Sequence, residues 1–134
     1  MRVTWTATAL ESSGRHCVVE RDSVLGELAE HFAELRSHGQ GYLEVRPSGG
    51  EFSRLALGFR GDRAVIHLLD DAERSFLLVG DGSVAADAVV DVPVMDDLAA
   101  FSGDFVLTVD RTWSLVGLFI RTGVPGALGR WCEL

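Results

Sequence analysis

The feature that most constrains the fold is a change of hydrophobic period along the chain. In residues 2–10 apolar and polar side chains alternate, which predicts a half-buried β-strand. Farther on, apolar residues recur at spacings of one, three and four, as on one side of an amphipathic helix: Val24, Leu25, Leu28, Ala29, Phe32 and Leu35. Both periods in succession predict a helix that packs on a sheet.

Strand-like runs surround this helix. Residues 15–20 predict a second strand in a hairpin with the first, and Asp22-Ser23 predicts the helix N-cap. Gly39 predicts the end of the helix, since glycine readily adopts the left-handed conformation. Four further short strands, separated by turn residues, are predicted at residues 42–46, 54–59, 63–69 and 75–79.

The pattern in residues 85–104 is mixed, because valines favour a strand and Pro93 interrupts it, so we expect a short strand and a loop. Residues 105–109 predict a strand, and Asp110-Arg111-Thr112 predicts the cap of a second helix over residues 113–121. The last residues predict a final strand. The fold class expected is α+β: a single domain, residues 1–134, with an antiparallel sheet of about six or seven strands and two helices packed on one face.

Composition narrows the possible partners. The 134 residues contain no uncharged apolar stretch of about 18 residues, so no membrane span is expected. The first residues lack the pattern of a secretory signal, which predicts a cytoplasmic protein. The formal net charge of −8 disfavours nucleic acid as a partner and favours a basic protein.

Motifs for catalysis or metal binding are missing from the sequence. It has no Gly-x-Ser-x-Gly elbow, no phosphate-binding loop and no lysine, and its four histidines are scattered. We therefore expect no enzymatic activity, no cofactor and no metal. The two cysteines, Cys17 and Cys132, lack metal-ligand spacing, and two free thiols are favoured, although a disulfide stays open at this point.

One segment concentrates negative charge. Residues 75–110 contain no Arg, Lys or His, and aspartates recur throughout. Such a segment is either a solvated edge or a surface that captures a basic partner by electrostatic steering, and the sequence weighs both equally. On the second interpretation Met95 and Phe101 fill pockets in the partner, and the partner-binding residues are Asp81, Asp87, Asp91, Asp96, Asp97 and Asp104.

The C-terminal part contains Phe119-Ile120-Arg121-Thr122-Gly123-Val124-Pro125, followed by Trp131-Cys132-Glu133. This resembles the ending of immunity protein family one of bacterial polymorphic toxin systems: a short amphipathic helix that ends in Phe-x-x-Thr-Gly-x-Pro, then a strand with Trp-x-Glu. The resemblance implies an α+β protein that binds and neutralises a cognate toxin, often a deaminase or another enzyme acting on nucleic acid. Val124 departs from the charged or polar residue common there. Trp113, Phe119 and Trp131 are expected to belong to the scaffold.

Two other functions remain open. The chain could be a small ligand-binding or regulatory domain with a pocket between helix and sheet. It could also be an acidic adaptor or chaperone for a secreted effector. The neighbouring genes distinguish these hypotheses, because a toxin gene, a secretion gene and a metabolic operon each favour a different one.

Overall fold

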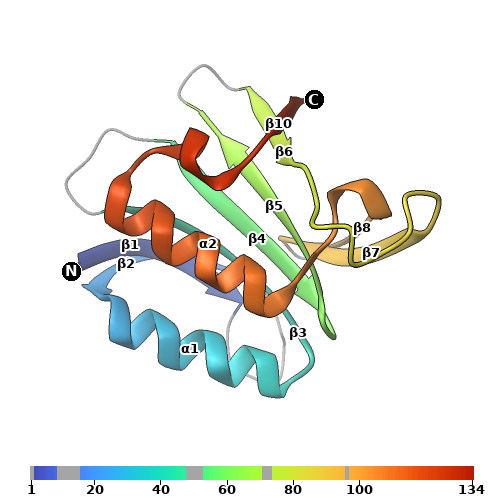
Figure 1. The fold of residues 1–134 in the computed structure, drawn as a ribbon. Coiled ribbons are helices and arrows are strands. Elements are labelled where there is room, and N and C mark those ends of the chain that lie inside the picture. Colours follow the sequence, from blue (N-terminus) through green and yellow to red (C-terminus); the bar gives the residue numbers. More distant parts are fainter. Residues whose placement is uncertain (1, 9–15, 48–52, 71–73, 96) are drawn as a thin grey trace.

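The computed structural model describes residues 2–8, 16–47, 53–70, 74–95 and 97–134. Within them an eight-stranded antiparallel sheet has the order β10-β6-β5-β4-β3-β1-β2, and β9 pairs with β5 (Figure 1). The strands of this main sheet are β1 (Arg2–Thr8), β2 (His16–Val24), β3 (Gln40–Pro47), β4 (Arg54–Arg60), β5 (Arg63–Leu69), β6 (Ser75–Leu78), β9 (Leu107–Thr108) and β10 (Trp131–Glu133).

Two helices of the described chain, α1 (Leu25–Ser37) and α2 (Val109–Thr122), lie on one face of this sheet (Figure 1). We call this face the helix side. Alternate strand residues meet the apolar stripes of both helices there, and Phe32 of α1 stacks on Trp113 of α2 with ring centroids 4.4 Å apart. The core on the helix side includes Val3, Leu28, Leu43, Leu57, Phe59, Ile66, Val116 and Phe119. The predicted α+β class, with both helices on one face, is confirmed.

The predicted N-cap of α1 is wrong. Ser23 still belongs to β2, where its hydroxyl accepts a hydrogen bond from the indole Nε1–H of Trp5 at 2.9 Å. The helix begins at Leu25, and Val24 occupies the N-cap position without a side-chain hydrogen bond. The Ser23 hydroxyl therefore accepts the hydrogen bond of a buried indole N–H and does not cap the helix. The predicted end is correct, since Gly39 has a φ of +89°.

The second helix starts one turn earlier than predicted. Its N-cap is Thr108, whose hydroxyl accepts from the amide of Arg111 at 3.3 Å, and Val109 is fully buried in its first turn. The strand expected over residues 105–109 shrinks to β9, which follows the 3₁₀ turn η1 (Gly103–Phe105). Gly123 ends the helix with a φ of +66°, as predicted, before the 3₁₀ turn η2 (Pro125–Leu128).

The opposite face of the sheet, which we call the reverse side, has a different cover. A separate two-stranded hairpin, β7 (Val89–Val94) and β8 (Asp97–Ser102), packs on it. The resulting small core consists of Val65, Leu77, Val90, Val92 and Val106. The strand predicted within residues 85–104 is thus confirmed at β7, but the predicted loop contains a second strand.

The reverse side beyond the hairpin is polar. The hydroxyl of Tyr42 on β3 donates to Oε2 of Glu44 at 2.6 Å, and Arg54 on β4 forms an ion pair with the same carboxylate at 3.1 Å. Burial, together with the hydrogen bond and charge of Glu44, raises the pKa of Tyr42 above its ordinary value. Both Tyr42 and Glu44 are buried, so this network replaces an apolar core on this part of the sheet.

The cysteines belong to opposite edges of the main sheet. Cys132 is an exposed free thiol on β10, and Cys17 lies in β2 at the other edge. This decides against the disulfide that the sequence left open. No helix within the described ranges is long and apolar enough to cross a membrane.

Candidate functional site

The acidic segment, residues 75–110, includes the β7–β8 hairpin, and a glycine on the main sheet positions this hairpin. Gly58 of β4 lies directly beneath Pro93, and a Cβ there would collide with the Pro93 carbonyl oxygen. The absence of a side chain lets β7 approach the sheet closely. Pro93 is tolerated because, in the part of the chain that the structure describes, β7 pairs with β8 alone and needs no donor on its outer edge.

The hairpin reverses direction between Val94 and Asp97. Val94 pairs with Asp97, and Met95 has a φ of +57°, the sign that two-residue hairpin turns require. Pro93, which was predicted to interrupt a strand, instead lies within β7. Asp96 lies outside the described residues.

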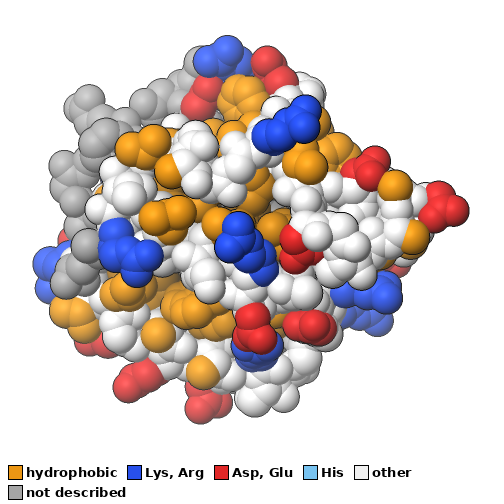
Figure 2. Space-filling view, viewed as in Figure 1, with side chains coloured by type: hydrophobic (Ala, Val, Ile, Leu, Met, Phe, Trp, Pro, Cys, Tyr) orange, Lys and Arg blue, Asp and Glu red, His pale blue; other side chains and the backbone are white. Residues whose placement is uncertain are grey.

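Four of the predicted partner-binding carboxylates are exposed on this unit: Asp87, Asp91, Asp97 and Asp104. None of the four makes an ion pair with another described residue. In Figure 2 acidic side chains surround the projecting hairpin, with apolar atoms between them and a basic side chain just below. The local charge is negative and is not neutralised within the hairpin.

The four carboxylates do not form one compact cluster. Asp91 is on the outer face of the hairpin, opposite Ala100. Asp97 lies at the turn, at a position that strand alternation assigns to the inner face. The other two, Asp87 and Asp104, lie near the open end, where the amide of Gly103 donates to the Ala88 carbonyl. Negative charge is therefore spread along the hairpin from its turn to its base.

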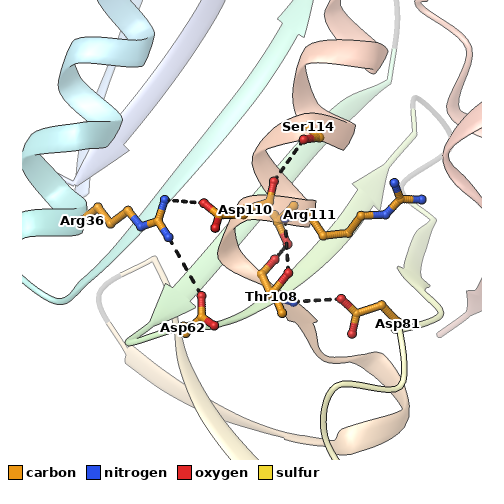
Figure 3. A network of polar contacts seen from close by, with 8 residues as sticks. Arg36, Asp62, Asp81, Thr108, Asp110, Arg111 and Ser114 are labelled. Atoms are coloured by element: carbon orange, nitrogen blue, oxygen red, sulfur yellow. Dashed lines mark hydrogen bonds and ion pairs between the residues drawn. The ribbon is translucent and has the colours of Figure 1, made fainter.

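Asp81, the fifth described member of the predicted set, has a structural role. One carboxylate oxygen accepts from the Ser83 amide at 2.9 Å. The other accepts from the Thr108 amide at 3.0 Å (Figure 3). Partial burial alone would raise its pKa, but these hydrogen bonds prevail and lower the pKa of Asp81 below its ordinary value. This side chain ties the turn after β6 to the start of α2.

Asp110, at the end of the acidic segment, is neutralised. Its carboxylate lies 2.7 Å from Nη1 of Arg36, and Nη2 of the same guanidinium lies 4.0 Å from Asp62 (Figure 3). The hydrogen bond to Asp110 raises the pKa of Arg36 above its ordinary value. This ion pair joins α1 to α2, and Asp110 does not contribute to the open acidic surface.

Exposed aliphatic side chains accompany the hairpin carboxylates. Val89 is 70% exposed, Met95 55% and Leu98 53%. Phe101, by contrast, points to the inner face and packs edge-on against His67 of β5, with ring centroids 5.3 Å apart. Met95 is thus exposed, whereas Phe101 helps to hold the hairpin on the sheet.

Two histidines, His31 and His67, have structural surroundings, whereas His38 is exposed. His31 is buried, and its Nε2 lies 2.9 Å from the Thr8 carbonyl oxygen, to which it donates. Burial beneath the hairpin lowers the pKa of His67. No group of three or more metal-ligating side chains occurs in the part of the chain that the structure describes.

Sequence reasoning did not predict a second acidic surface, beside α1. An open hollow of about 660 Å³ is lined there by Glu27, Glu30 and Glu34, together with Trp5 and Arg21. Arg21 covers the Trp5 ring, with its guanidinium carbon 5.1 Å from the ring centroid. The spacing of the three glutamates at three and four residues was the available signal, because it places them on one side of a helix.

No protein-family model matches the chain, and a search of curated proteins finds no match either.

Proposed function

We propose that this chain is a binding protein of the immunity type, which neutralises a cognate bacterial toxin by covering the toxin's basic active site with the β7–β8 hairpin. The proposal is carried by one observation: exposed Val89, Met95 and Leu98 lie beside carboxylates that have no ion-pair partner among the described residues. Protein interfaces combine such apolar anchors with complementary charge.

The chemistry of the partner follows from this surface. Enzymes that act on nucleic acid carry cationic sites, because they must attract phosphates. Carboxylates along the hairpin would steer association with such a site, and the aliphatic side chains would supply contact area once the partner is bound. The resemblance of the C-terminal segment to immunity protein family one supports the same proposal, which involves no catalysis.

The test is co-expression with the toxin encoded beside the gene. We expect rescue of cell growth and a stable complex with the toxin. Asp91→Asn combined with Asp97→Asn should slow association severalfold at low salt and weaken its salt dependence. The matched control, Glu27→Gln with Glu30→Gln, removes the same charge from the α1 surface and should have a smaller effect. A larger effect of the control would place the interface at α1, and failure to form a complex would contradict the proposal.

The hollow beside α1 favours a second candidate, the small ligand-binding domain. Its volume suits a small molecule, but its lining is strongly acidic and open. A neighbouring metabolic operon instead of a toxin gene would support this candidate.

A further inference from the structure

A smaller cleft lies on the helix side, between α2, η2 and the edge of the sheet. Its volume is about 230 Å³. Its floor consists of side chains that belong to the main core: Leu78, Leu107, Leu115 and Leu128. Arg111 from α2 and Arg130, just before β10, line the same cleft. A small apolar floor is thus combined with two cationic side chains.

The two arginines are not neutralised within the described chain. Neither side chain makes an ion pair or a hydrogen bond with a described residue, although five other arginines form ion pairs: Arg2, Arg36, Arg46, Arg54 and Arg74. Asp81 also lines the cleft, but both of its oxygens are occupied by backbone amides. In Figure 3 Arg111 extends from α2 on the side away from Asp110, and no contact joins it to Asp81.

A glycine borders the floor of the cleft. Gly129 has a φ of +146°, which side chains rarely adopt, and a Cβ there would lie 3.3 Å from Cδ1 of Leu78. Any larger residue would therefore be strained and would crowd the leucine floor.

We propose that this cleft binds a small carboxylate with a short aliphatic group. The carboxylate would pair with Arg111 and Arg130, and the aliphatic group would cover the leucines. The volume lies below that of pockets for drug-sized ligands, which restricts the aliphatic group to a few carbons. A free acid and the C-terminus of a peptide ending in leucine both have this chemistry. The inference is independent of the hairpin and of the proposed partner.

The test is an NMR titration of the full chain with hexanoate, with hexanol and acetate as controls that lack the charge or the tail. We expect amide shifts at Val79, Gly80 and Gly129, tightest binding for hexanoate, and affinity losses of about tenfold for Arg111→Gln and for Arg130→Gln. Arg121→Gln is the matched control, because Arg121 is also on α2, exposed and without an ion pair among described residues, but does not line the cleft.

A second titration compares acetyl-Gly-Leu with its C-terminal amide. Selective binding of the acid supports the proposal. Tighter binding of acetyl-Gly-Leu than of hexanoate assigns the ligand to a peptide C-terminus, and weaker binding assigns it to a free acid. Three results would overturn the proposal. Hexanoate and hexanol could bind equally, the Arg121 and Arg111 variants could lose equal affinity for hexanoate, or neither acid could bind at millimolar concentration. Unchanged thermal unfolding of each variant shows that the fold is intact.

Discussion

The two sides of the main sheet are covered in different ways. On the helix side, α1 and α2 share one continuous core that extends from Val3 to Leu128. On the reverse side, the hairpin has a small separate core beside the polar network of Tyr42, Glu44 and Arg54. Segments with few buried apolar contacts open more easily than the main core, so the hairpin is expected to open independently of the helices. The proposed interface thus belongs to the less firmly held side.

The largest effect is expected from removing an aromatic ring on the helix side. Phe119→Ala should lower the free energy of unfolding by about 3–5 kcal/mol, because this fully buried side chain leaves a cavity. Phe101→Ala, the matched change on the hairpin, should cost about 1–2 kcal/mol. Urea unfolding measures both, and amide hydrogen exchange should show faster exchange throughout for the first variant and only in β7 and β8 for the second. Equal, global effects would mean that the two sides unfold as one unit.

A backbone contact allows a more direct test of hairpin docking. Gly58→Ala should destabilise the protein by about 1–3 kcal/mol, because its Cβ meets the Pro93 carbonyl. Hydrogen exchange should again locate the change in the hairpin. Gly26→Ala on α1 is the control, since a Cβ there contacts nothing within 4 Å and should be neutral or stabilising. If the Gly58 variant is as stable as the control, the hairpin can move away from the added Cβ without loss of stability.

A pH dependence should also distinguish the sides. The pKa of folded His67 is lowered from its ordinary value of 6.5, so the unfolded chain binds a proton more readily than the folded chain does. This contribution to stability is complete above pH 6.5 and declines as the pH falls below it. The protection factors of the β7 and β8 amides, which correct for the pH dependence of intrinsic exchange, should therefore fall below this pH, and this dependence should be lost in His67→Gln. His38→Gln, a change at an exposed site, should retain it.

The smallest effect is expected at the ion pair between the helices. Asp110→Asn should cost less than about 1 kcal/mol, because exposed ion pairs contribute little and salt screens them. Thermal unfolding at low and high salt measures this difference, which should disappear at high salt. A loss comparable to that of Phe119→Ala would show that Asp110 contributes more than an exposed charge.

The fold class was predictable because hydrophobic period reports which face of each element is buried, and both helices and most strands follow it. The predictions failed where a side chain bonds to a residue far away in the sequence. Ser23 is a good capping residue, but the Trp5 indole takes its hydroxyl. The strands β7 and β8 were hard to predict because Pro93 disfavours a strand in general, and it is acceptable here because β7 pairs with β8 alone among the described residues.

The candidate site was predictable in charge and less so in geometry. The lack of any basic residue in residues 75–110 marks the segment in the sequence. That Asp81 would serve backbone amides, and that Arg36 would reach Asp110, depends on contacts between elements far apart in the chain. No sequence pattern predicted the cleft with Arg111 and Arg130, because its lining comes from four separate segments.

The order of the strands also affects how the chain folds while the ribosome synthesises it. The first four strands, β1 to β4, are neighbours in the sheet and can pair as soon as they emerge, with only α1 to cover them. The apolar surface that α2 covers on β3, β4 and β5 stays open until residues 109–122 have been synthesised. Nascent chains that stall before this point would expose that surface, and they should be the species most prone to aggregate and to recruit chaperones.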